Sequence, residues 1–171
     1  WRGTSASNPA DEWIELKNNT SKAIDLSQWV LYSETDLGPY ISFAKAANKI
    51  IPANGYYLIE RTDDTTISTI TGDFATSFVN ELGNAVGETL TLVKIFGGAT
   101  TTIDRVPTCG NNWCGGSNSA YYTMERRDPL IAGDVASNWG TNNGIITREK
   151  DAQGILVLGT PKARNSLHYL I

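Results

Sequence analysis

The sequence predicts an all-β domain built as a sandwich or barrel. Short runs of apolar or alternating residues recur along the chain, separated by Gly, Pro, Asn and Asp. No segment keeps the 3.6-residue apolar period of an amphipathic helix. Thr, Val and Ile, which favour a pleated backbone, are frequent. With 171 residues and 40% hydrophobic content, the chain is long enough for one domain with its own core, and we expect residues 1–171 to form a single domain.

The first predicted strands lie in the N-terminal third. Ile14 and Leu16 alternate with polar residues, which is typical of a half-buried strand. Apolar stretches follow at 23–26 and 29–32. Between them, residues 25–28 predict a tight turn in which Asp and Ser side chains bond nearby backbone amides.

The middle of the chain predicts a short strand and a hairpin. Residues 40–43 form the strand, and residues 44–49 favour one helical turn. Asn54-Gly55 stands between apolar runs at 50–51 and 56–59. Because both residues tolerate positive φ, this dipeptide predicts a β-hairpin.

The second half predicts another hairpin and a further strand. Gly97-Gly98 separates strands expected at 90–93 and 101–103. Residues 121–125 predict one more strand. Residues 144–158 indicate a loop or an added hairpin.

The two cysteines predict a closed loop. Cys109 and Cys114 flank a segment rich in Gly and Asn, and a short disulfide at a loop tip is the favoured interpretation. Two free thiols are the alternative. A zinc site needs about four ligands, and the single histidine, His168, lies far along the chain. A disulfide indicates an oxidising compartment.

Charge and hydropathy argue against two classes of partner. The net charge is −4, from 14 basic and 18 acidic residues, whereas a domain that reads phosphates usually carries a basic stripe. No apolar run approaches the ~18–20 residues of a membrane span. Residue 1 is Trp, which predicts a mature or excised fragment. The absence of a signal peptide therefore says nothing about export.

Candidate catalytic groups are few. His168 is the only histidine, and no serine lies in the Gly-x-Ser-x-Gly motif that would supply a nucleophile for it. Glu12 and Glu15, or the adjacent Asp63-Asp64, could form a carboxylate pair, but Glu15 is expected to face solvent and Asp63-Asp64 to sit in a polar turn. The acidic loops lack the pattern of a calcium site. We therefore predict no catalysis, no metal and no cofactor.

Aromatic residues are the candidates for ligand contact. Trp113 stands at the tip of the cysteine loop, and Tyr121 and Tyr122 follow soon after. The alternative is that Trp113 folds back over the sheet edge. Trp29 and Trp139 are expected in the core.

Several phrases occur in an order that resembles one known family. These phrases are Glu12-Trp13-Ile14-Glu15-Leu16-Lys17-Asn18, Ile24-Asp25-Leu26-Ser27-Gln28-Trp29, Ile51-Pro52-Ala53-Asn54-Gly55-Tyr56, Gly87-Glu88-Thr89-Leu90-Thr91-Leu92, Met124-Glu125-Arg126, Ser137-Asn138-Trp139 and Gly159-Thr160-Pro161. Together they span about residues 12–165 and resemble the lamin tail domain family. The resemblance implies an immunoglobulin-like β-sandwich.

The resemblance also implies a role. With the disulfide and the acidic composition, it favours the bacterial branch, whose domains are accessory modules of secreted or surface proteins. We expect an extracellular module that binds or tethers a protein or glycan, with a structural spacer as the alternative and nucleic-acid binding, as in nuclear lamins, as a minor one. Gln28 stands where the family usually has Gly. The family's first strand is expected upstream of residue 1, so its absence would open a sheet edge and favour self-association.

Overall fold

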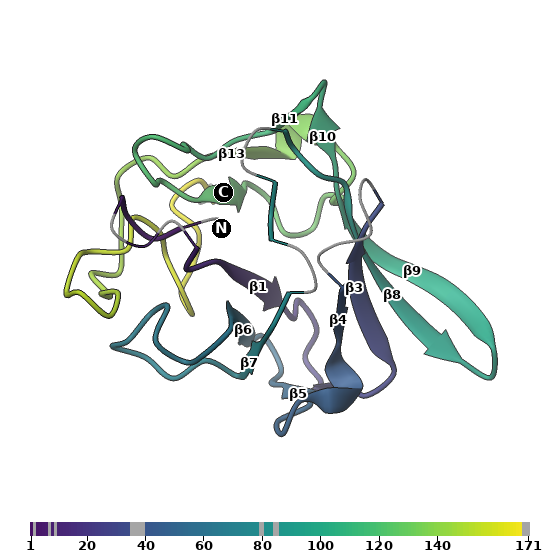
Figure 1. Cartoon of the computed structure of the whole chain (residues 1–171). Helices are drawn as coiled ribbons and strands as arrows, with labels where there is room; N and C mark the ends of the chain where they lie inside the picture. Colours follow the sequence, from purple (N-terminus) through teal and green to yellow (C-terminus); the bar gives the residue numbers. More distant parts are fainter. Residues whose placement is uncertain are drawn as a thin grey trace.

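The protein is a β-sandwich of two facing sheets (Figure 1). The computed structural model describes residues 1, 3–6, 8, 10–34, 40–78, 81–83 and 86–168. One sheet has the order β1-β6-β7, with β1 Trp13–Lys17, β6 Tyr56–Arg61 and β7 Phe74–Thr76. The other has the order β4-β3-β8-β9, with β3 Trp29–Ser33, β4 Tyr40–Ser42, β8 Leu90–Phe96 and β9 Ala99–Val106. The predicted all-β, immunoglobulin-like class is confirmed.

Three short strand pairs and two helical turns complete the described part. The pairs are β2 Ile24–Asp25 with β5 Ile50–Ile51, β10 Thr108–Cys109 with β11 Asn112–Trp113, and β12 Met124–Arg126 with β13 Trp139–Thr141. The 3₁₀ turns are η1 Phe43–Lys45 and η2 Ala136–Asn138. In the described residues, no helix has the length and apolar character that a membrane span needs.

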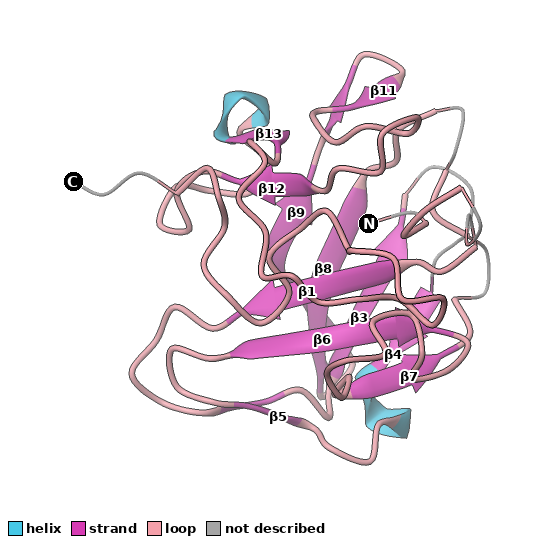
Figure 2. Cartoon of the chain, turned by 90° about the vertical axis from the view of Figure 1, so that its left-hand side faces the viewer, coloured by secondary structure: helices cyan, strands magenta, loops and turns pink. Residues whose placement is uncertain are grey.

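The core occupies the space between the sheets. Tyr57, Ile59 and Phe43 are fully buried there, and Phe43 packs edge-on against Tyr57 with ring centroids 5.8 Å apart. A second, smaller cluster lies on the opposite face of β1 and β6, where Trp13 and Leu58 pack with residues from later loops. Both faces of this sheet are therefore covered, which is visible in Figure 2 as loops crossing in front of β1 and β6.

The alternation predicted for the first strand explains this two-sided burial. Ile14 and Leu16 pack on the inter-sheet core, whereas Trp13 belongs to the outer cluster. Successive strand residues point to opposite faces, so one five-residue strand serves both clusters.

The Asn54-Gly55 turn forms, but the predicted hairpin does not. Asn54 adopts a positive φ of 52°, yet β5 pairs with β2 and β6 pairs with β1. The side chain of Asn18 gives the physical reason. Its amide donates to the Pro52 carbonyl at 2.9 Å and to the Lys22 carbonyl at 2.7 Å, which holds the turn against the β1–β2 connection. The two strands then join different sheets.

Other local predictions hold with shifted boundaries. The Asp25 carboxylate accepts the Ser27 N–H at 2.8 Å in the predicted turn, and β8 and β9 form the predicted second hairpin. The strand expected from residue 121 begins at Met124, because Tyr121 has a φ of 60° that no strand accommodates.

Residues 144–158 form a loop with one bridge, between Lys150 and Leu156, and it anchors the N-terminal segment. Buried Asp151 accepts hydrogen bonds from the side chains of Thr4 at 3.2 Å and Asn8 at 2.9 Å. Burial alone would raise the pKa of Asp151, but hydrogen bonds from the Ile155 N–H and from Asn8 lower it.

Candidate functional site

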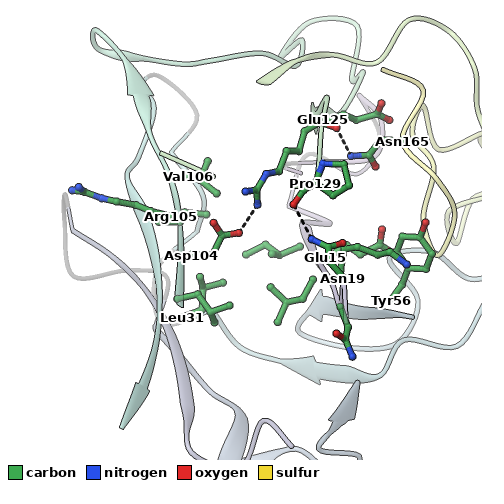
Figure 3. Close-up of a pocket in the computed structure, with 18 of the residues that line it drawn as sticks. Glu15, Asn19, Leu31, Tyr56, Asp104, Arg105, Val106, Glu125, Pro129 and Asn165 are labelled. Carbon is green, nitrogen blue, oxygen red and sulfur yellow. Dashed lines mark hydrogen bonds and ion pairs between the residues drawn. The ribbon is translucent and has the colours of Figure 1, made fainter. Parts of the chain in front are cut away.

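An apolar cleft opens between the two sheets, where β1 faces β9. Its volume is about 910 Å³, within the range of roughly 300–1,000 Å³ that is usual for ligand sites. In Figure 3, Glu15 and Tyr56 lie on one side of this space, and Leu31, Asp104 and Val106 lie on the other.

All five tryptophans of the chain line the cleft, namely Trp1, Trp13, Trp29, Trp113 and Trp139. They come from segments far apart in sequence. Trp29 packs against the core as predicted, and Trp139 is half-buried, with its indole N–H donating to the Gly133 carbonyl at 2.7 Å. Tryptophan combines a large apolar surface with one polar group, and such residues dominate interface energetics.

Aliphatic side chains form the deep part of the cleft. Ile14 and Leu16 come from β1, and Leu31, Leu92 and Val106 come from the opposite sheet. These residues belong to the inter-sheet core or pack against it. The cleft is therefore a part of the space between the two sheets that is open at the side of the sandwich. Its aliphatic walls suit a ligand with apolar groups.

Polar contacts close part of the mouth. The Arg126 guanidinium pairs with the Asp104 carboxylate at 2.6 Å, and the Asn19 amide donates to the Pro129 carbonyl at 2.8 Å (Figure 3). The first link joins β9 to β12, and the second joins the β1–β2 turn to the segment after β12. They fix the spacing of the two walls.

The outer edge of β1 carries backbone groups that face the cleft. The Asn18 N–H donates to Gly55 O, and the Arg61 N–H donates to Glu12 O. The backbone N–H and C=O groups of the even-numbered residues of β1 therefore point toward β6. In an antiparallel ladder the alternate residues point the other way. The backbone N–H of Trp13 points away from β6 in this way and donates to Trp1 O at 2.8 Å. Within the described residues, the corresponding groups of Glu15 and Lys17 have no protein partner.

Glu15 was predicted to face solvent, and this prediction was wrong. Its side chain points away from Ile14 and Leu16, but the C-terminal segment covers it, and its carboxylate accepts the Lys162 N–H at 2.6 Å. Burial raises the pKa of Glu15 to about 8. Glu12 is fully buried and accepts the Leu82 N–H at 3.0 Å. The two carboxylates thus hold backbone segments in place.

The predicted contact residues separate into two groups. Trp113 is half-buried, its indole N–H donates to Gly83 O at 2.9 Å, and its ring packs edge-on against Trp1 at 6.5 Å. It therefore lies back over the sandwich while lining the cleft. Tyr121 and Tyr122 are half-buried outside the residues that line the cleft. The structure does not bring them to Trp113, and their role as ligand contacts stays a prediction.

The cysteine loop adopts the predicted covalent closure. Cys109 and Cys114 form a disulfide with Cα atoms 5.0 Å apart, in the β10–β11 hairpin. The hairpin packs tightly on Gly87, whose N–H donates to Asn111 O at 2.9 Å. A Cβ at Gly87 would lie 2.2 Å from the Asn112 carbonyl carbon, so only glycine fits there.

We expect reduction of this disulfide to lower the free energy of unfolding by about 2 kcal/mol, since a short closed loop restricts the unfolded chain only modestly. Denaturant unfolding with and without reductant measures the difference. Cys109→Ser combined with Cys114→Ser should reproduce it. An unchanged transition would contradict a stabilising role for the bond.

The acidic loops show no metal constellation. Among the described residues, no three His, Cys, Asp or Glu side chains converge. The Asp63 carboxylate accepts the Thr65 N–H at 3.0 Å and the Asp128 carboxylate accepts the Leu130 N–H at 2.8 Å, so both cap turns. The predicted polar turn at Asp63-Asp64 is confirmed.

Comparison with known families decides the assignment. The sequence model of the Lamin Tail Domain family matches residues 2–108. The chain belongs to the lamin tail domain family. The match covers β1 to β9, so it includes both walls of the cleft. Searches of curated proteins and of solved structures gave no match.

The part of this lamin tail domain beyond residue 108 completes the site. It supplies Trp113, Trp139 and the segment from Pro129 to Asp134, all of which line the cleft. The sequence phrases at Met124-Glu125-Arg126 and beyond also lie outside the matched residues. The cleft therefore combines the family's sandwich with features of the C-terminal third.

Proposed function

We propose that this lamin tail domain is a non-enzymatic, extracellular or cell-surface accessory module that binds or tethers a ligand in its cleft. The observation that carries the proposal is the 910 Å³ apolar space lined by all five tryptophans. A purely structural spacer has no need of an open cleft in its core, because unfilled apolar space forgoes packing energy. The bacterial, secreted setting remains part of this proposal.

The chemistry of the cleft favours some ligands over others. Its deep part is aliphatic, and its rim carries both signs of charge, including Arg126 and Asp104. A polypeptide or glycan with an apolar face fits this description. Nucleic acid is disfavoured by the net charge of −4. The disulfide is compatible with an oxidising, extracellular location.

Ligand binding is tested by tryptophan fluorescence and thermal shift on the purified chain, with extended peptides, cell-wall glycans, Ca²⁺ and short duplex DNA as probes. We expect one ligand class to change the fluorescence and to stabilise the fold by about 2.7 kcal/mol at a hundredfold excess over its Kd. Calcium and DNA serve as negative controls. The absence of any response would favour the spacer and overturn the proposal.

A further inference from the structure

We infer that two copies of the chain associate through β9, whose outer edge pairs antiparallel with the same edge of a second copy. The pairing joins the two β4-β3-β8-β9 sheets into one continuous sheet. This inference goes beyond the proposed ligand site, because it concerns the distal half of the β8–β9 hairpin. It follows from the exposure of that hairpin, the backbone groups along β9 and the register that these groups allow.

The distal half of the β8–β9 hairpin projects from the sandwich (Figure 1). All residues from 94 to 103 are exposed, and the side chain with the largest apolar surface among them, Phe96, is 68% exposed. No charged residue and no proline occurs between residues 95 and 103. Proteins commonly use lysine or proline to keep an edge strand from pairing with another chain, so this edge lacks two common protections.

The hydrogen bonds of β8 show which backbone groups of β9 point outward. The Ile95 N–H donates to Gln28 O at 2.8 Å, so the odd-numbered residues of β8 direct their backbone groups toward β3. Thr100 lies opposite Ile95, and Thr102 lies opposite Val93. Opposed residues of an antiparallel pair point either toward each other or both away. The N–H and C=O groups of Thr100 and Thr102 therefore point away from β8, and no backbone group in the described part of the chain bonds to them.

The outward edge of β9 has two defined ends. The Gly97-Gly98 turn forms the first, and the space around it is open, since a Cβ on either glycine would meet no atom within 4 Å. At the second end, the β12–β13 loop lies against β9, because a Cβ on Gly133 would lie 2.3 Å from Arg105 O. Ile103 has no partner in the β8–β9 register, which marks a β-bulge. The edge available for pairing is thus residues 99–103, about 16 Å at ~3.3 Å per residue.

One antiparallel register uses both outward residues of each copy. It places a twofold axis at Thr101, so that Thr100 of each copy lies opposite Thr102 of the other. Each of these pairs exchanges both of its backbone hydrogen bonds. An axis at Thr100 or at Thr102 would leave the other outward residue unpaired. The edge is therefore complementary to itself, as a twofold contact between identical chains requires.

The side chains of this register favour a second copy over an unrelated strand. Thr101 faces Thr101 of the second copy, and cross-strand threonine pairs stabilise a sheet. Ala99 faces Ile103 of the second copy. Because Ala99 is small, Phe96, which is its neighbour on β8, has room to cover that isoleucine. Phe96 and Ile103 are 68% and 42% exposed in the single chain, so the dimer removes apolar surface from water.

The contact is short, so we expect a weak dimer, as is usual for small interfaces. In analytical ultracentrifugation, the average mass of the native chain should rise from the monomer toward the dimer between about 10 µM and about 1 mM. A mass that stays at the monomer value over this range would overturn the inference. So would growth beyond the dimer, because it would indicate a head-to-tail contact.

Two charge variants test the position of the axis. Thr101→Lys places two ammonium groups opposite each other in the dimer, and Thr101→Glu places two carboxylates there. Each variant alone should associate at least about tenfold more weakly than the native chain, because like charges directly opposite destabilise a strand pair. An equimolar mixture should recover the dimer, because lysine then faces glutamate. Association of the single variants at the native strength, or a mixture that stays monomeric, would contradict an axis at Thr101.

Matched controls separate the axis from a general effect of charge. Ser119→Lys and Ser119→Glu introduce the same groups at an exposed position in the loop that follows the β10–β11 hairpin. Both should associate like the native chain, and unfolding curves show whether every variant folds. Thr101 does not line the cleft, so the fluorescence response to a cleft ligand should be unchanged in the Thr101 variants. The dimer and the ligand site can therefore fail independently.

A second pair of variants tests the backbone bonds. Thr100→Pro removes an outward N–H, which an edge strand tolerates without losing its inner ladder. Thr100→Ala removes the same hydroxyl and keeps the N–H. We expect association at least about tenfold weaker for Thr100→Pro and within about twofold of native for Thr100→Ala. Equal association of these two variants would show that β9 does not pair through its backbone and would overturn the inference.

Discussion

Replacing Glu125 by Ala is expected to lower the free energy of unfolding by about 3–5 kcal/mol. Glu125 lies on β12 and is 4% exposed. Its carboxylate binds several segments of the C-terminal third through hydrogen bonds. Its oxygens accept hydrogen bonds from Asn142 Nδ2 at 2.7 Å, Thr160 Oγ1 at 3.1 Å, and the N–H and hydroxyl of Ser166 at 2.8 and 2.7 Å. The substitution removes the shared acceptor of the buried Asn142 and Thr160 side chains and of the half-buried Ser166. Each buried hydrogen bond that is lost without replacement costs about 1–3 kcal/mol.

Denaturant unfolding measures this loss, and hydrogen exchange locates it. We expect the amide of Ser166 and its neighbours to lose protection, because the C-terminal segment is released from β12. Glu149→Ala is the matched control, since that carboxylate bonds one hydroxyl, on Thr69, and its loss should cost below about 1 kcal/mol. If Glu125→Ala destabilised no more than the control, the carboxylate would not be the organising contact.

A second large effect is expected from pH, through Glu60. This residue of β6 is fully buried; one carboxylate oxygen accepts the Ile67 N–H at 3.4 Å and the other has no partner among the described residues. Burial, with a smaller contribution from the Asp64 charge, raises the pKa of Glu60 to about 7 from 4.5. The folded state then holds a proton that the unfolded chain releases, so the free energy of unfolding falls as the pH rises from about 4.5 to 7.

Glu60→Gln removes this dependence. The change from 4.5 to about 7 corresponds to about 3 kcal/mol at pH 8, at ~1.4 kcal/mol per pKa unit. The variant should therefore gain stability relative to the native chain between pH 5 and pH 8, by up to that amount. The exposed Glu81→Gln controls for loss of a surface charge. Parallel pH profiles for the native chain and Glu60→Gln would contradict a protonated Glu60.

Local pattern was enough to predict most of the sandwich. The alternation around Ile14 and Leu16 and the Gly97-Gly98 turn are encoded within a few residues, so the strands they predict are present. The prediction of an Asn54-Gly55 hairpin was wrong because the amide of Asn18 holds that turn through the carbonyl of Pro52, 34 residues along the chain. Such a contact depends on the assembled fold and leaves no local signal.

The site was predicted only in part for the same reason. Spacing was sufficient for the Cys109–Cys114 bond. Trp113 lies back over the sandwich, which was one of its two predicted positions, and its role as a ligand contact stays a prediction. The convergence of Trp1, Trp29 and Trp139 was missed, since they meet only after the sheets pack. The one usable signal was the presence of five tryptophans in a chain with four phenylalanines.

The most direct test of ligand binding in the cleft is an amide and indole NMR spectrum of the chain, recorded with and without the ligand class that stabilises the fold in the thermal-shift experiment. If a ligand occupies the cleft, the indole signals of the tryptophans that line it shift, and the amide signal of Gly97, at the tip of the β8–β9 hairpin, stays unchanged. Shifts confined to the hairpin tip, or no shifts at saturating ligand, would contradict binding in the cleft.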